Sequence, residues 1–171
     1  TGEFQLSENP ELEKSWCKMK YSLSSLVYSN YLLKDAILAI AHAGYDGIDI
    51  WGGRQQAYRD DLNSSQITEI CKILNGEGLI VPSVIPAQFR YPTSLCSPLD
   101  NIRLDSVEYI KKGIDLAVAV NSPIVSICPG HAVFGQSVRD GYLRLFDSII
   151  RICEYADQFS IKIALEPADK Y

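Results

Sequence analysis

Histidine is scarce in this sequence, which contains only two histidines in 171 residues. Positive charge is also in deficit, because 16 Lys and Arg residues face 21 Asp and Glu residues and leave a net charge of −5. This balance provides no basic surface of the kind that binds nucleic acid or an anionic membrane. No apolar run approaches the roughly 18 residues that a transmembrane helix needs. We therefore expect neither nucleic acid nor membrane as a partner.

Cysteine is present but is not arranged in pairs. The five cysteines are odd in number and include no Cys-x-x-Cys spacing, which is not the pattern of a disulfide framework. Cys71 and Cys153 fall on apolar stripes of predicted helices and Cys128 falls in a predicted strand, so we interpret them as small core residues. Reduced thiols, together with an N-terminus that lacks a signal-peptide core, favour a cytoplasmic location.

The remaining composition is that of an ordinary globular protein, with 47% hydrophobic and 22% charged residues. The length fits a single domain with one sizeable core. Residues 1–18 are polar and acidic and have no hydrophobic period. We expect them to form a flexible extension before a domain that covers residues 19–171.

From Met19 onward, short apolar runs alternate with segments of helical period. Asn63 and Gln66 have the spacing of a capping box, and Gly44 and Gly78 stand where a helix would end. The helices are predicted near residues 33–44, 63–78, 101–120 and 140–159. The strands are predicted at about residues 20–27, 47–51, 79–85, 123–128 and 161–165.

This β-α alternation predicts a parallel sheet covered by helices, for which two architectures compete. A doubly wound open sheet carries a glycine-rich turn after its first strand, and residues 24–30 (SSLVYSN) contain no glycine. A (β/α)8 barrel needs eight units and typically about 250 residues, whereas five strands and four helices are predicted here. A barrel would therefore be only partial.

The stretch GYDGIDIWGGR (44–54) places a carboxylate in the middle of an apolar strand. If Ile48 and Ile50 face the helices, strand alternation points Asp49 and Trp51 to the opposite face, the interior of a barrel. A buried carboxylate must be paired, hydrogen-bonded or bound to a ligand. A substrate contact and a structural carboxylate satisfied by a neighbouring strand are both open.

Two glycines and an arginine follow this strand. Gly52 and Gly53 would allow a sharp turn and the close approach of a ligand to the backbone. Arg54 is a candidate contact for an anionic or polyhydroxyl substrate, although most loop arginines are simply solvated.

A second carboxylate ends the last strand, IKIALEP (161–167). If Ile163 and Leu165 pack on helices, Glu166 points inward at the carboxyl end of the strand. Barrel enzymes carry their catalytic residues at this end. A glutamate at this position can bind a hard divalent cation or move a proton. The alternative is a salt bridge at the edge of the sheet.

The two histidines differ in their predicted surroundings. His42 lies near the end of a predicted helix, where a cation suits the helix dipole, and we interpret it as structural. His131 follows the fourth predicted strand and is a candidate substrate contact or acid-base group. The long loop PAQFRYPTSL (86–95) has the length of a lid or substrate wall.

With these motifs in view, residues 20–171 resemble the sugar-phosphate isomerase/epimerase family, the xylose isomerase-like barrels. The segments AGYDGIDIWGGR (43–54), DLN (61–63) and LEPADKY (165–171) are most similar to the fructoselysine 3-epimerase-type branch. The resemblance implies a (β/α)8 barrel enzyme that epimerises or isomerises a sugar or sugar derivative through an enediolate.

The resemblance also implies a divalent cation, which is manganese, magnesium or cobalt, with zinc as an alternative. Glu166 matches the ligand at the end of the fifth strand, which also acts as one of two acid-base carboxylates. Asp49, Trp51 and His131 match positions near the substrate, and Arg54 lies within the matching motif. The other cation ligands are expected beyond residue 171.

Because only five strands are predicted, we expect a partial barrel with two free sheet edges and an uncovered apolar interior. We also expect the 171 residues alone to be inactive. A noncatalytic half-barrel, a homo-oligomer, and an inosose dehydratase or hydroxypyruvate isomerase are alternatives. A DNA-binding, endonuclease IV-like protein is disfavoured by the few histidines and the negative charge.

Overall fold

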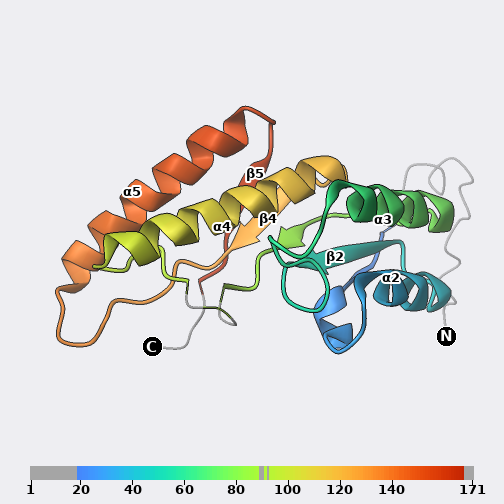
Figure 1. Ribbon diagram of the computed structural model, residues 1–171, viewed down its shortest axis with the longest axis horizontal. Helices are drawn as coiled ribbons and strands as arrows, with labels where there is room; N and C mark the ends of the chain where they lie inside the picture. The colour runs from blue at the N-terminus through green and yellow to red at the C-terminus, as the bar shows by residue number, and fades with distance from the viewer. Residues whose placement is uncertain (1–18, 89–90, 92, 168–171) are drawn as a thin grey trace, which may run out of the picture.

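The strands form one continuous parallel sheet, shown in Figure 1. The computed structural model describes residues 19–88, 91 and 93–167, and the predicted extension over residues 1–18 lies outside this range. The elements are β1 (Ser22–Ser24), the 3-10 helix η1 (Ser25–Tyr28), α2 (Leu33–His42), β2 (Gly47–Trp51), α3 (Ser64–Glu77), β3 (Val84–Ile85), α4 (Asp100–Ala119), β4 (Ile124–Ile127), α5 (Val138–Asp157) and β5 (Lys162–Leu165).

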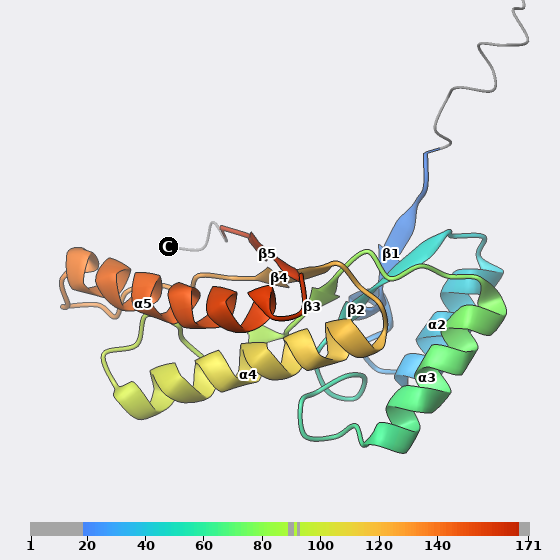
Figure 2. The same cartoon turned by 90° about the horizontal axis from the view of Figure 1, so that it is seen from above.

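The strand order decides between the two predicted architectures. Neighbours in the sheet are consecutive in the chain, β1-β2-β3-β4-β5, and every pair is parallel. A doubly wound sheet reverses its order at a switch point and carries helices on both faces. Here all four α-helices lie on the same face of the sheet, as Figure 2 shows. The fold is therefore a partial (β/α) barrel, and the doubly wound alternative is wrong.

The core lies between this helical layer and alternate residues of the strands. Ile48 and Ile50 of β2, Val84 of β3 and Val125 of β4 are all fully buried at 0% exposure. The predicted helix stripes meet them from the other side, and the fully buried members include Ile37, Ile40, Ile110, Ile114 and Ile152. Burying side chains of this size contributes roughly 1.5–3 kcal/mol each.

The ends of α3 are formed as the sequence predicts. The Asn63 side chain accepts hydrogen bonds from the backbone N–H groups of Ser65 and Gln66, both at 3.0 Å. The Gln66 side chain accepts the Asn63 N–H at 2.9 Å in return, which completes the capping box. Gly78 ends the helix in the left-handed conformation, with φ of 68°.

Three predicted strands are too long. The first ends at Ser24 because the Ser24 hydroxyl accepts the Leu26 N–H and begins η1. The third is reduced to β3, since Pro82 has no N–H to donate, and Ile80 is left with a single bridge to Gly47. The fourth ends one residue before Cys128.

The face of the sheet away from the helices carries polar as well as apolar side chains, so it is not the wholly apolar interior that the sequence predicts. By strand alternation, the positions next to Ile48, Ile50, Val84 and Val125 are occupied by the apolar Ile85 and Ile124 and by a set of small polar side chains. The polar side chains on this face are Ser22, Ser24, Asp49, Ser83 and Ser126. We call this surface the polar face.

One row of exposed apolar side chains follows α5. Val138, Tyr142, Phe146 and Ile150 recur every four residues and are 76%, 64%, 56% and 41% exposed. Leu165 of β5, predicted to pack on a helix, is 49% exposed, because β5 is an edge strand of the described sheet. Among the described helices, none has the length and apolarity required to cross a bilayer.

We expect Gly→Ala substitutions at two glycines near the end of α3 to change stability in opposite directions. Gly76 lies inside the helix with open space around its missing Cβ, so Gly76→Ala should stabilise the protein by about 0.5–1 kcal/mol. Gly78→Ala should destabilise it by about 1–2 kcal/mol because φ is positive there. Urea unfolding of both variants measures the difference, and effects of the same sign would contradict the assigned helix end.

Candidate active site

The carboxyl ends of the five parallel strands meet at one edge of the sheet. This edge, the carboxyl rim, consists of the residues that end or directly follow the strands: Ser25, Trp51–Arg54, Pro86–Gln88, Cys128–His131 and Glu166. It contains four of the five residues singled out in the sequence. The fifth, Asp49, lies two residues inside β2.

Asp49 is satisfied by both neighbouring segments of the sheet. Its carboxylate accepts a hydrogen bond from the Ser22 hydroxyl of β1 at 2.6 Å and another from the Ser83 hydroxyl, just before β3, at 2.7 Å. Hydrogen bonds to a charged group contribute about 1.5–3 kcal/mol each. The neighbouring segments therefore satisfy this carboxylate, and a contact between Asp49 and a substrate stays a prediction.

The two glycines after β2 are required by their neighbours. A Cβ on Gly53 would lie 2.2 Å from the Trp51 indole, and a Cβ on Gly52 would lie 3.1 Å from the Cα of Pro86. Trp51 is only 4% exposed, and its backbone N–H donates to the Ser25 hydroxyl at 2.9 Å. The indole therefore fills the space beside Gly53, and Pro86 fills the space beside Gly52. The proposed role of Trp51 against a substrate is not tested by this arrangement.

Arg54 is held within its own loop. Its Nε and Nη2 donate to the two carboxylate oxygens of Asp61 at 2.7 and 3.0 Å. The guanidinium also lies over the Tyr58 ring, 4.2 Å from its centroid. A substrate anion would have to compete with Asp61 for these guanidinium N–H groups, so a substrate contact of Arg54 remains a prediction.

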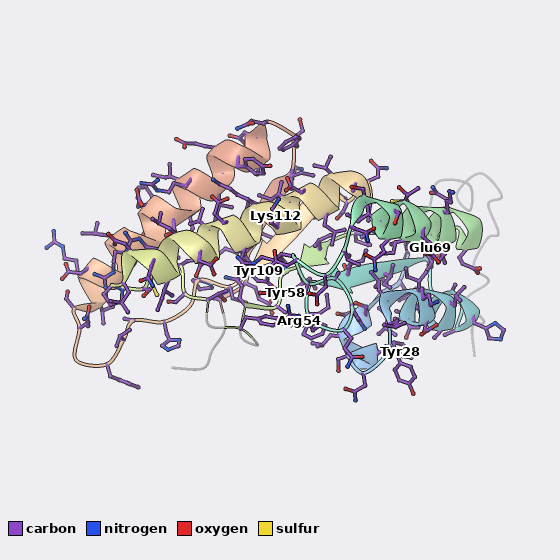
Figure 3. All side chains as sticks on the ribbon, viewed as in Figure 1. Tyr28, Arg54, Tyr58, Glu69, Tyr109 and Lys112 are labelled. Atoms are coloured by element: carbon purple, nitrogen blue, oxygen red, sulfur yellow. The ribbon has the colours of Figure 1, made fainter. Side chains whose placement is uncertain are left out.

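Three tyrosines connect the ends of β2 and β3, a feature that the sequence analysis missed. Tyr58 lies between Tyr91 and Tyr109, with ring centroids 4.5 and 5.8 Å away. Figure 3 shows Tyr58 and Tyr109 gathered beside Arg54. The buried Tyr109 hydroxyl donates to the carbonyl of Gly52 at 2.8 Å and accepts the N–H of Ala87 at 3.0 Å. Burial raises the pKa of Tyr109, which keeps this hydroxyl protonated as a donor.

Gln88 connects the end of β3 to the end of β4 and was also missed. Its side-chain amide donates to the Cys128 carbonyl at 2.9 Å and accepts the Cys128 N–H at 2.6 Å. Gln88 is 7% exposed, so both bonds are shielded from water. The amide therefore acts as a strand partner for Cys128 where the β-ladder stops. The only signal for this role in the sequence is that Gln88, a polar residue, comes shortly after the third predicted strand.

Glu166 lies on the polar face at the carboxyl rim. It directly follows β5, and its N–H donates to the Ile127 carbonyl of β4 at 2.8 Å. Burial raises the pKa of the Cys128 thiol, and the negative charge of Glu166 raises it further, which places this carboxylate near the end of β4. The Glu166 side chain is exposed and available to a ligand.

His131 is also at the rim, in the loop after β4. Its side chain is exposed, and its carbonyl accepts the Cys96 thiol at 2.8 Å. Within residues 19–88, 91 and 93–167, no three His, Cys, Asp or Glu side chains group closely enough to hold a metal ion. The described residues therefore offer single candidate ligands, such as Glu166, and do not form a metal site by themselves.

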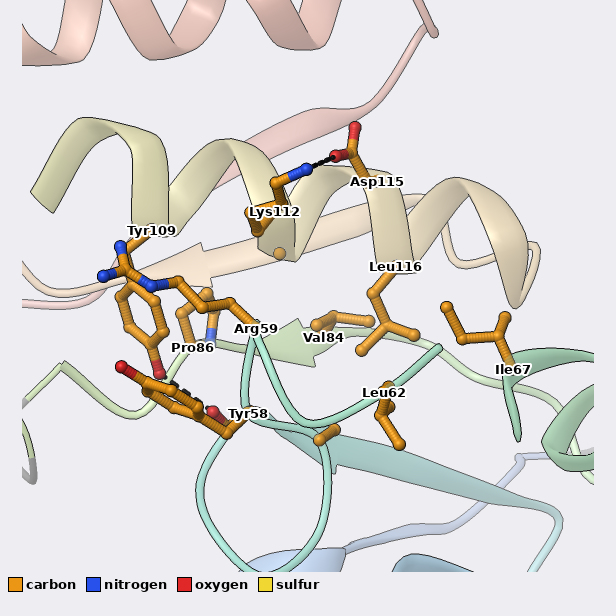
Figure 4. A pocket seen from close by; sticks show the side chains of 13 residues that line it. Tyr58, Arg59, Leu62, Ile67, Val84, Pro86, Tyr109, Lys112, Asp115 and Leu116 are labelled. Carbon is orange, nitrogen blue, oxygen red and sulfur yellow. Dashed lines mark hydrogen bonds and ion pairs between the residues drawn. The ribbon is translucent and has the colours of Figure 1, made fainter. Parts of the chain in front are cut away.

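A cavity of about 210 Å³ lies on the helical side of the sheet rather than on the polar face, as Figure 4 shows. Its floor includes Val84 and Pro86, and α4 contributes Leu116 to its wall. The cations at its border are already neutralised, with Lys112 3.5 Å from Asp115 and Arg59 2.9 Å from Asp105. The lining of this cavity includes Gly52 and Pro86 of the carboxyl rim, but not Arg54, His131 or Glu166.

We expect a large loss of stability when the Gln88 side-chain amide is removed. Gln88→Leu deletes both hydrogen bonds and leaves the buried Cys128 N–H without a partner, so it should cost about 2–4 kcal/mol. Gln158→Leu, at an exposed glutamine at the end of α5, should change stability by less than about 0.5 kcal/mol. Urea unfolding followed by tryptophan fluorescence compares the two variants. Equal costs would show that the Gln88 amide does not hold the rim together.

Comparison with known proteins agrees with this architecture. The chain is 28% identical over 153 residues to fructoselysine 3-epimerase of Shigella flexneri and 27% identical to that of Escherichia coli O157:H7, covering 90% of this chain. It spans 55% and 56% of those relatives, about half their length.

Solved structures show the same fold. A D-tagatose 3-epimerase-like protein superposes with a TM-score of 0.77 at 24% identity, covering 90% of this chain and 54% of that one. The 3-keto-D-glucoside 4-epimerase of E. coli superposes with a TM-score of 0.73 at 17% identity, covering 90% and 58%. Residues 37–171 match the family described as xylose isomerase-like TIM barrel. The chain belongs to the xylose isomerase-like TIM barrel family.

Proposed function

We propose that this chain forms the first five strands of a metal-dependent sugar epimerase or isomerase, in which Glu166 is both a cation ligand and an acid-base group. The observation that supports this most directly is the exposed Glu166 carboxylate at the carboxyl end of β5, on the polar face of a sequentially ordered parallel sheet. Barrel enzymes hold their catalytic groups at this end. The sugar epimerases among its relatives make a sugar or sugar derivative the proposed substrate.

Glu166 would remove or return the proton on the carbon beside the substrate carbonyl. The carboxylate takes the proton, the C–H electron pair forms the enediolate, and return of a proton to the opposite face gives the epimer. A divalent cation, proposed as manganese, magnesium or cobalt with zinc as the alternative, would supply polarisation of the carbonyl when bound. The second carboxylate and the other cation ligands would come from the polypeptide that completes the barrel.

The polar face is suited to a polyhydroxyl substrate. Ser126 and Asp49 present hydroxyl and carboxylate oxygens on this face, and His131 and Arg54 lie at the rim above it. We propose that these groups contact the sugar hydroxyls in the complete site. For Arg54 this requires that a substrate shares or displaces Asp61.

The exposed flank of α5 indicates where the barrel would continue. Tyr142, Phe146 and Ile150 of α5 are exposed, and β5 is an edge strand of the described sheet. A further strand and helix would cover both surfaces, and a second copy of the chain is the alternative. The described cysteines are free, which supports a reducing, cytoplasmic location.

Joining this chain to the unmatched part of the S. flexneri fructoselysine 3-epimerase tests the proposal. With Mn²⁺, the joined protein should epimerise fructoselysine and incorporate deuterium from D₂O at the carbon that loses its proton. Glu166→Gln should lower the rate by about 10²–10⁴-fold and weaken Mn²⁺ binding. Circular dichroism establishes that each variant folds.

Glu154→Gln, at an exposed position on α5, is the matched control and should leave rate and Mn²⁺ affinity unchanged. The 171-residue chain alone should show no measurable turnover. An unchanged rate for Glu166→Gln at saturating Mn²⁺ would remove Glu166 from the mechanism. Metal-dependent epimerisation by the chain alone would contradict the need for a completed barrel.

A further inference from the structure

A second cavity, of about 380 Å³, lies between α2, α3 and the loop that follows β2. It does not include Glu166, His131 or the polar face. Its apolar lining comes from both helices and the loop, and Leu33 and Ile70 are its most deeply buried members at 3% and 5% exposure. The full lining is Leu32, Leu33, Lys34, Arg54, Gln55, Gln56, Asp61, Leu62, Gln66, Glu69, Ile70 and Ile73.

Opposite charges are available on the two helical walls. Lys34 lies in the first turn of α2 and Glu69 lies on α3, where Figure 3 labels it. Both side chains are exposed, and neither forms an ion pair with any residue in the described part of the chain. The other two charged lining residues, Arg54 and Asp61, neutralise each other at 2.7 Å.

The start of α2 adds donors to the wall that carries Lys34. Leu32 is the N-cap and provides no side-chain hydrogen bond to the first turn. The N–H groups of Leu33 and Lys34 have no intrahelical acceptor at this position. Together with the ammonium group of Lys34, they favour a carboxylate.

A buried acceptor without a partner lies among the same lining residues. Gln56 is 4% exposed, and its Nε2 donates to the carbonyls of Ser25 at 2.9 Å and Tyr28 at 2.8 Å. These two bonds fix the orientation of the amide. Its Oε1 is then left buried without a hydrogen bond. An unsatisfied buried acceptor costs about 1–3 kcal/mol, which a ligand N–H would recover.

We propose that this cavity binds a free α-amino acid with a branched apolar side chain. The ligand carboxylate pairs with Lys34 and the N–H groups at the start of α2, and its ammonium group donates to Glu69 and Gln56 Oε1. The side chain packs on Leu33 and Ile70. The volume accommodates a ligand of this size, and the combination of one cation, one anion and an apolar wall selects a zwitterion over a sugar. This site does not rest on the proposed epimerase function, although Arg54 belongs both to its lining and to the groups proposed to contact the sugar.

L-Leucine is the probe, titrated into the 171-residue chain by calorimetry and by ¹H–¹⁵N NMR. Binding should be saturable and should shift the side-chain amide signal of Gln56. Lys34→Met and Glu69→Gln should each weaken it at least about tenfold, since each removes a charge-assisted hydrogen bond. Both positions are exposed, so the variants should fold normally.

Lys72→Met and Glu77→Gln, exposed positions on α3 outside the lining, are the matched controls and should bind L-leucine normally. 3-Methylbutylamine, which lacks the carboxylate, should bind more weakly and should be insensitive to Lys34→Met. 4-Methylpentanoate, which lacks the ammonium group, should be insensitive to Glu69→Gln. The proposal is overturned by absent binding, by equal loss in the control variants, or by binding of uncharged 3-methylbutanol as tight as that of L-leucine.

Discussion

Packing of alternate strand residues against a single helical layer is the constraint on which the rest of the structure depends. Ile48, Ile50, Val84 and Val125 are fully buried against the helices. Because side chains alternate along a strand, each buried residue commits its neighbour to the other face. The same packing that forms the core therefore creates the polar face, and a shift of one residue in any strand would exchange the two.

At the carboxyl rim, side chains that bond to backbone groups supplement the backbone bonds of the sheet. Tyr109 connects the ends of β2 and β3, and Gln88 connects the ends of β3 and β4. Glu166 is joined to the end of β4 by a backbone bond of the sheet, from its N–H to the Ile127 carbonyl. The Tyr109 and Gln88 side chains that form the other bonds are buried. Shielding of these bonds from water makes each one expensive to lose.

Much of the fold could be predicted from the sequence because its signals are local. The periods of the four helices, the Asn63–Gln66 capping box and the left-handed Gly78 depend on residues close together in the chain. The strand ends depend on single residues such as Ser24 and Pro82, whose effect a hydrophobic run conceals. The polar side chains on the inner face were not predicted because the serines within the apolar runs were not assigned to a face.

The site could be predicted only in part, for a different physical reason. Strand alternation was sufficient to place Asp49 and Glu166 away from the helices. The partners of Asp49, Arg54 and Gln88 come from segments 7 to 40 residues away, so they depend on the register of the sheet and the course of the loops. Residue type alone could not show that Asp61 accepts both hydrogen bonds from the Arg54 guanidinium. It also could not show that the Trp51 indole fills the space beside Gly53.

The assignment of the two faces is tested most directly in β4, where consecutive residues are small and central in the sheet. Ser126→Cys and Val125→Cys, each with the native cysteines replaced by serine, can be compared by their rate of reaction with a maleimide. The account predicts that the thiol at position 126 reacts at least about tenfold faster, because Val125 is 0% exposed and Ser126 lies on the polar face. Equal rates, or faster reaction at position 125, would contradict the placement of the polar face and with it the site built on Glu166.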